Sequence, residues 1–176
     1  MEPLRRLRAE DMVEVWCAAA MSMRAHAPGL DSRGPSTAVG TTLTTLLDRI
    51  VESVRSATSL TAVADGVDRT PAAADSTLPT VTLVAEFLGG VGDSCRNCDD
   101  LDATRVAMAF EAGVDRMRST AGRTLDAAVI TVATAVAEAA LRAADGGLPL
   151  AEMLIEAADS GLDALEARAT AELAAD

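Results

Sequence analysis

The chain has 176 residues, 49% of them hydrophobic, which is long enough for one domain with a sizeable core and too short for two. Its formal net charge is -12 at pH 7 and all 15 basic residues are arginine, which disfavours binding to nucleic acid or to an anionic membrane surface. No stretch reaches the roughly 20 apolar residues that cross a bilayer, and Glu10, Asp11 and Glu14 interrupt any N-terminal secretory core. We therefore expect a cytoplasmic protein with a single domain over residues 1–176.

Composition also predicts the fold class. Aromatic residues make up only 2% of the chain, whereas alanine and leucine, both strong helix formers, are abundant. Apolar residues recur at helical spacing along nearly the whole chain. Together these features predict an all-α antiparallel bundle or barrel of about seven to eight helices.

The first predicted helix covers residues 7–27 and ends at Pro28-Gly29, because this pair is a typical helix stop. Its apolar stripe contains Leu7, Met12, Val15, Trp16, Ala19 and Met23.

The next helix is expected over residues 41–57, followed by a short helix over residues 59–68. The apolar stripe of the longer helix contains Leu43, Leu46, Leu47, Ile50, Val51 and Val54. Residues 68–79 have the composition of a linker.

Residues 80–92 begin with β-branched residues, which are typical of a strand, but their helical neighbourhood and the lack of a partner strand favour a helix. A further helix over residues 100–122 has Asp100 or Asp102 as its N-cap. Its stripe contains Val106, Phe110, Val114 and Met117.

Residues 125–145 are apolar nearly all round as far as Ala137, which predicts the central and most buried helix. Gly146-Gly147 ends this helix. The last helix begins at Pro149 and completes the bundle.

Cys95 and Cys98 form a C-x-x-C pair in a polar loop. A zinc site would need two more ligands, and Cys17 and His26 would make an unusually scattered set, so no metal is expected. Reduced, unligated cysteines are the favoured interpretation, with a loop disulfide as the alternative.

Five segments of the chain resemble the helices of the DhaL-type domain of dihydroxyacetone kinases and bacterial fatty acid kinases. The segments that carry the resemblance are the first helix with its continuation to Leu30-Asp31, VGTTLTTLL at 39–47, TLVAEFLGGV at 82–91, LDATRVAMAFEAGVDRM at 101–117 and RTLDAAVITVATAVAEAA at 123–140. The resemblance covers nearly the whole chain and implies an antiparallel helical barrel, in which relatives can hold a lipid-like molecule.

The loops differ from those of the family. Its magnesium-binding aspartates fall at Ser36 and Ala38, which cannot supply charged oxygens to a hard cation. Its phosphate-cradling loop falls near Pro79-Thr80-Val81, where proline lacks an N–H and valine blocks a close backbone approach. The resemblance thus implies a DhaL-like protein that has lost ATP and magnesium binding and is neither a kinase nor a phosphatase.

Three polar residues are candidate catalytic groups, each with a structural alternative. Glu86 interrupts an apolar run and could act as an acid or base, or be a charge at the bundle rim. Asp126 begins the most apolar helix, where it could instead compensate the helix dipole. His26 is the only imidazole, and the alternative is an ordinary residue near a helix C-terminus.

Four further residues are candidate ligand contacts: Thr41, Thr80, Arg123 and Trp16. Asp31 is a weaker candidate, as a remnant of the family's segment before its metal loop. We expect the loop over residues 35–41 to lie at the mouth of an apolar pocket, with residues 79–81 facing it.

Two functions follow from these observations. In the first, the barrel binds an apolar acyl- or polyketide-like small molecule and serves natural-product biosynthesis, as a cyclase, isomerase or lyase without a cofactor. In the second, the chain is a non-catalytic partner or scaffold of a kinase-like or biosynthetic complex. A homodimer is left open in both cases.

Overall fold

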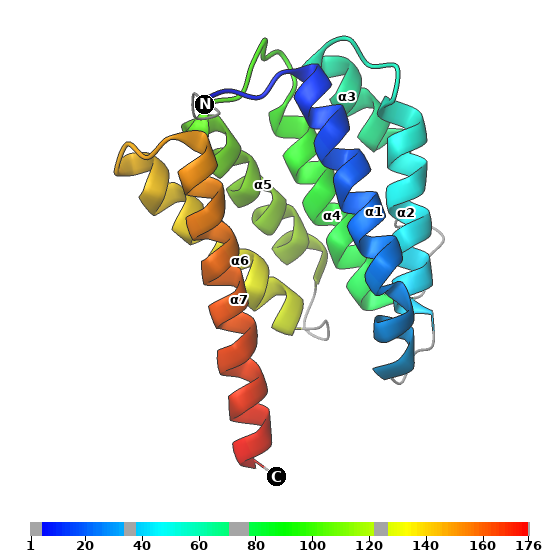
Figure 1. Ribbon diagram of the computed structural model, residues 1–176, viewed down its shortest axis with the longest axis vertical. Helices are drawn as coiled ribbons and strands as arrows, with labels where there is room; N and C mark the ends of the chain where they lie inside the picture. The colour runs from blue at the N-terminus through cyan, green and yellow to red at the C-terminus, as the bar shows by residue number, and fades with distance from the viewer. Residues whose placement is uncertain (1–4, 34–37, 71–77, 122–126, 176) are drawn as a thin grey trace.

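A computed structural model describes residues 5–33, 38–70, 78–121 and 127–175, which form an all-α bundle as predicted. Successive helices run in alternating directions (Figure 1). Their bounds are α1 Ala9–Arg33, α2 Val39–Val54, α3 Leu60–Asp68, α4 Pro79–Ser94, α5 Ala103–Ala121, α6 Ala127–Asp145 and α7 Leu150–Ala175. The described residues contain no β-strand, although the backbones of Leu7 and Leu101 form a single antiparallel bridge.

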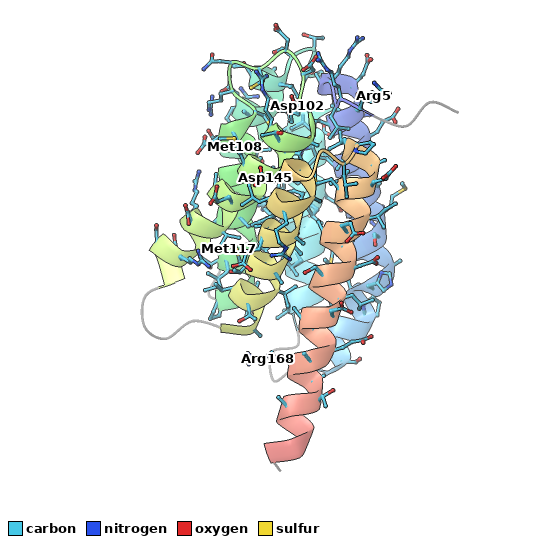
Figure 2. The ribbon with its side chains drawn as sticks, turned by 90° about the vertical axis from the view of Figure 1, so that its left-hand side faces the viewer. Arg5, Asp102, Met108, Met117, Asp145 and Arg168 are labelled. Atoms are coloured by element: carbon cyan, nitrogen blue, oxygen red, sulfur yellow. The ribbon has the colours of Figure 1, made fainter. Side chains whose placement is uncertain are left out.

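Helices that follow one another in the chain are also neighbours in space, and the closest pairs are α4–α5, α6–α7 and α1–α2. By contrast, close backbone contacts between α1 and α7 are few in the described part of the chain. The C-terminal half of α7 projects beyond the other helices (Figure 1), and Arg168 lies on this half (Figure 2). The prediction that the last helix completes the bundle is therefore met only by its first half.

The predicted end of the first helix at Pro28-Gly29 is wrong, because α1 continues through Pro28 to Arg33. Proline interrupts the helical hydrogen bonding, but contacts beyond it hold the last turns in place. The Ser32 hydroxyl donates to the Gly29 carbonyl at 3.0 Å, and the Asp31 carboxylate binds the first turn of α2. One local contact and one tertiary contact thus support the part of α1 that follows the stop signal.

The middle helices agree with the sequence. The Ser59 hydroxyl caps α3 by accepting from the Ala62 N–H at 3.1 Å, and Pro79 begins α4, which is a helix and not a strand. At the start of α5 the Asp102 carboxylate accepts from the Arg105 N–H at 3.0 Å. Figure 2 shows Asp102 at one end of α5, with Met108 and Met117 farther along it.

The main core lies between α1, α2, α3 and α4 and extends to parts of α5, α6 and α7. A smaller cluster around Leu83 and Met117 joins α4, α5 and α6. The prediction that residues 125–145 form the most buried helix is wrong, because residues 128–136 of α6 are only half-buried or exposed. This half of α6 borders an open groove, described below, which residues of α4, α5 and α7 also line.

Glycines permit the close approach of α4 to α5. A Cβ atom at Gly90 would lie 2.7 Å from the Cα of Gly113 and 2.7 Å from the Ala112 carbonyl oxygen. Because these atoms belong to the backbone, only glycine allows the two helices to pack this closely. No helix among the described residues is long and apolar enough to cross a membrane.

Candidate functional site

An apolar cavity of about 220 Å³ lies between α1, α4, α5 and the first half of α7. We call it the Trp16 cavity. No polar surface contributes to its wall. Its lining residues are Leu7, Met12, Val15, Trp16, Ala19, Phe87, Leu88, Val91, Leu101, Val106, Ala109, Phe110 and Leu154.

The three aromatic residues of the chain, Trp16, Phe87 and Phe110, all line this cavity. They come from three helices, because each lies on the inward face of α1, α4 or α5. The rings of Phe87 and Phe110 are tilted by 33° with centroids 6.1 Å apart, which is a favourable aromatic contact. In a chain with 2% aromatic residues, this convergence distinguishes the Trp16 cavity from the rest of the core.

A second apolar space of about 400 Å³ opens between α4, α5, α6 and α7. We call it the α6 groove. Phe87 lines both spaces, so they adjoin at its ring. The lining of the groove consists of Val84, Phe87, Met117, Ala128, Val129, Val132, Ala133, Val136 and Leu165.

Trp16, predicted as a ligand contact, is 5% exposed and lines the Trp16 cavity. Val15 was expected in the buried stripe of the first helix but is 48% exposed, at the edge of this cavity. This part of α1 borders the cavity, so Val15 is not covered by a closely packed neighbouring helix.

Glu86 does not line either apolar space, although its neighbour Phe87 lines both. Its carboxylate is held by the Arg116 guanidinium at 2.8 Å, and Arg116 also binds Asp93 at 2.7 Å. The hydrogen bond that Arg116 donates to Glu86 is the main cause that raises the pKa of Arg116. The geometry therefore makes Glu86 a member of an ion pair between α4 and α5.

The ion pairs continue from Asp93 to Arg96 at 3.3 Å. Arg96 also binds Asp65 and Asp68 on α3. Hydrogen bonds to these carboxylates raise the pKa of Arg96, and the bond to Asp65 has the largest effect. The guanidinium thus occupies the centre of this acidic cluster and ties α3 to the end of α4.

The other predicted site residues that the structure describes in this region, His26 and Thr80, line neither apolar space. His26 is exposed on α1, and its Nδ1 lies 2.8 Å from the Ser22 carbonyl oxygen, a hydrogen bond within the helix. Thr80 is half-buried in the first turn of α4. Ser36, Arg123 and Asp126 lie outside the described residues. No hydrogen bond or ion pair given by the structure joins His26 to Glu86.

Asp31 binds the beginning of α2. Its carboxylate accepts from the Gly40 N–H at 2.6 Å, from the Thr41 hydroxyl at 2.6 Å and from the Thr41 N–H at 3.2 Å. The hydrogen bond from Thr41 is the main cause that lowers the pKa of Asp31. The polar atoms of Thr41 are therefore directed to Asp31.

The predicted pocket mouth at residues 35–41 includes residues outside the described part of the chain, so it stays a prediction. Residues 38–41 and 79–81 line neither the Trp16 cavity nor the α6 groove, and residues 35–37 lie outside the described part. Gly40 packs directly on α1, since a Cβ there would lie 2.4 Å from the Ala27 carbonyl oxygen. This contact and the hydrogen bonds of Asp31 join α1 to the first turn of α2.

The three cysteines are free. Cys95 ends α4 and is buried, with its thiol 3.3 Å from the Val91 carbonyl oxygen. Burial, with a smaller contribution from Cys98, raises the pKa of Cys95 to about 11. In the described part of the chain, no three histidine, cysteine or acidic side chains group as metal ligands would.

Phe87, Phe110 and Leu154 line the cavity but were not predicted as site residues. The signal for the two phenylalanines was the scarcity of aromatic residues, which makes each aromatic position informative, whereas Leu154 carried no comparable signal. No protein-family model and no curated protein matches this chain.

Proposed function

We propose that this chain binds an apolar small molecule in the Trp16 cavity, with the α6 groove taking any longer part of the ligand. The observation that carries the proposal is the convergence of all three aromatic side chains on one apolar cavity. Binding sites for small molecules are concave, mostly apolar and rich in aromatic side chains. Alanine and valine around the α6 groove leave space that larger side chains would fill.

We propose that the chain binds this molecule, and we assign no chemical reaction to the site. No titratable side chain lines either space in the described part of the chain. An acid–base step, as in the expected cyclase, isomerase or lyase, would need a proton carrier brought close to the ligand. Glu86 is next to the lining residue Phe87 in sequence, but Arg116 holds its carboxylate.

We also propose that ATP and magnesium do not bind, in keeping with a DhaL-like bundle whose loops have lost their ligands. The N–H groups at the start of a helix are a common phosphate site. In this chain the Asp31 carboxylate already accepts from the Gly40 and Thr41 N–H groups and would repel a phosphate.

The binding proposal is tested with ethylbenzene as an uncharged apolar probe, measured by calorimetric titration. Ala19 lines the cavity, whereas its neighbour Ala18 is exposed on the same helix. Ala19→Phe should fill the cavity and weaken binding at least tenfold, and the matched control Ala18→Phe should bind within twofold of the wild type. If the wild type does not bind the probe, or both variants bind it equally, the proposal fails.

A second candidate function, a partner or scaffold subunit, is supported by a different observation. Large apolar side chains are exposed mainly on α1 and α7: Val15, Met21, Leu30, Ile155, Leu162 and Leu165. Exposed apolar surface of this kind is typical of a face that contacts another protein. If Ala18→Phe and Ala19→Phe bound ethylbenzene equally well, this second candidate would be favoured.

A further inference from the structure

One flank of α7 carries exposed apolar residues, which we call the α7 stripe. They recur at alternating spacings of three and four residues: Ile155, Ala158, Leu162, Leu165 and Ala169. All of them are exposed, and three have large apolar side chains. Single exposed apolar residues are common on protein surfaces, but an apolar line at this spacing is typical of a helix that packs against another helix.

The packing of α7 within the bundle leaves this stripe uncovered. The buried residues of α7 lie on another side of the helix: Leu150, Met153, Ala157 and Gly161. Around the helix axis these residues lie about a third of a turn from the α7 stripe. The closest packed neighbour of α7 is α6, and the stripe continues onto the half of α7 that projects beyond the other helices (Figure 1).

A row of carboxylates follows one edge of the α7 stripe. Glu152, Asp159 and Glu166 are spaced by seven residues, and all three are exposed. In a heptad whose a and d positions form the stripe, these residues take the e positions. The g positions on the opposite edge are buried or half-buried: Leu154, Gly161 and Arg168. The exposed edge of the stripe is therefore negatively charged.

We propose that the α7 stripe binds one amphipathic helix of another protein, with apolar residues over the stripe and arginine or lysine residues facing its carboxylates. Charges at the e and g positions select the partner of a helix pair, because opposite charges attract and like charges repel. Leu165 also lines the α6 groove, so an apolar side chain of the partner next to Leu165 can enter this groove. The inference goes beyond binding in the Trp16 cavity, and it names the surface and the partner chemistry of the second candidate function.

A second copy of this chain would not match the charges of the α7 stripe. In an antiparallel pair the e positions of one helix face those of the other, so carboxylates would meet carboxylates. In a parallel pair Asp159 and Glu166 would face Leu154 and Gly161, which carry no positive charge. The net charge of -12 also opposes self-association and contact with an anionic membrane. Charge therefore favours a basic helix of a different protein.

The test uses two synthetic peptides of about four heptads, both with leucine at the a and d positions. One peptide has lysine at its e and g positions, and the other has glutamate. Like charges at these positions oppose pairing of each peptide with itself. Calorimetric titration of the full chain should show binding of the lysine peptide about tenfold or more tighter than binding of the glutamate peptide.

The variant Leu162→Glu tests the apolar contact, and Met108→Glu on α5 is its matched control. The exposed fractions of Leu162 and Met108 are 55% and 56%, so each variant adds one charge at an equally exposed site. Leu162→Glu should weaken binding of the lysine peptide about tenfold or more, because a carboxylate would be placed against leucine. Met108→Glu should bind the peptide within twofold of the wild type. Equal binding by the two variants would refute the role of the stripe.

The acidic edge is tested by the double variant Asp159→Asn with Glu166→Gln. Its control is Glu156→Gln with Asp163→Asn, because these residues are also exposed on α7 but take b positions, away from the stripe. Both double variants remove two charges. The first should weaken binding of the lysine peptide about threefold to tenfold, and the control should stay within twofold. Equal losses would mean that the peptide responds only to the net charge, which would refute the proposed pairing.

The remaining outcomes separate the possible occupants of the stripe. Analytical ultracentrifugation should show the full chain as a monomer, whereas a dimer that Leu162→Glu dissociates would assign the stripe to a second copy and overturn the proposal. If neither peptide binds, or both bind equally, the proposal is refuted. Ethylbenzene binding in the Trp16 cavity is measured separately, so either proposal can fail while the other stands.

Discussion

Asp31 occupies the position at which an anion would meet the N-terminus of α2. The first N–H groups of a helix have no partner within the helix, and the Asp31 carboxylate satisfies those of Gly40 and Thr41. A negative charge there also interacts favourably with the helix dipole. One residue thus caps α2, joins it to the end of α1 and closes a potential phosphate site.

We predict that Asp31→Asn destabilises the protein at pH 7 and that this effect diminishes in acid. Folding lowers the pKa of Asp31 from 3.8, so the stability that its charge contributes is present above 3.8 and is lost as pH falls through the lower folded value. Thermal melting at pH 7 and at several lower pH values measures the difference between variant and wild type.

Asp163→Asn is the control, because Asp163 is exposed on α7. Its melting temperature should follow the wild type at every pH. A difference for Asp31→Asn that stays constant down to pH 2 would contradict the role of the Asp31 charge.

At the scale of single residues the sequence is only partly informative. The capping roles of Ser59 and Asp102 follow from residue type and position, because each caps the helix that begins next to it. The contact of Asp31 with Thr41 crosses a helix junction, and the pair Glu86–Arg116 joins two helices. Such pairings depend on helix packing, which residue patterns do not specify.

At the scale of helices, the pair α4–α5 depends on contact between backbones. Gly90 and Gly113 face each other there, and Phe87 packs over Gly113, where an added Cβ would lie 2.7 Å from its ring. The same helix pair positions Phe87 and Phe110 at the Trp16 cavity. The width of the cavity is therefore linked to the closeness of these helices.

We predict that Gly90→Ala destabilises the protein by about 1–3 kcal/mol, because overpacking forces the backbones of α4 and α5 apart. Gly29→Ala is the matched control, since an added Cβ on α1 meets nothing within 4 Å. In a helix this control should be stabilising by about 0.5–1 kcal/mol. Urea unfolding of both variants gives the two values, and equal stabilities would contradict the packing argument.

Most helices could be predicted from the period of the apolar residues, and the structure confirms the helical state of residues 80–92. Two predictions at this scale were wrong for physical reasons. The stop signal at Pro28 was outweighed by contacts of residues that follow it. The apolar helix α6 was expected to be central, but an all-round apolar pattern is equally compatible with a helix that borders a groove.

At the scale of the whole molecule, α7 divides into a packed half and a projecting half. Its buried residues among those described are Leu150, Met153, Ala157 and Gly161. The approach at Gly161 is close, since an added Cβ would lie 2.7 Å from a side-chain carbon of Val136 on α6. Residues beyond 165 contribute to no described core cluster.

We predict that a chain ended after Ala169 melts within about 2 °C of the full chain, because Thr170 and Ala171 are exposed and no described residue beyond 165 belongs to a core cluster. A chain ended after Glu156 loses Ala157 and Gly161 and should melt about 5–10 °C lower. Differential scanning calorimetry of both truncated chains makes the comparison. A large loss of stability in the longer chain would show that the projecting half supports the fold.

The site is the part of the molecule that the sequence predicts least. Trp16 was recognised as a candidate contact, but its meeting with Phe87 and Phe110 depends on how α1, α4 and α5 are arranged. Glu86 and His26 were selected for their chemistry, and the structure gives each a local partner away from the cavity wall. Residue type alone does not say which side chains a cavity will gather.

The arrangement in which every helix packs on its neighbour in the chain also affects how fast the protein folds. Contacts between successive helices close only short loops, and the entropy lost in closing a loop grows with its length. Because close backbone contacts between α1 and α7 are few in the described part of the chain, pairs of successive helices can gain stability before the two ends meet. Folding can then begin at any adjacent pair of helices and spread along the chain, which places this protein among topologies that fold rapidly.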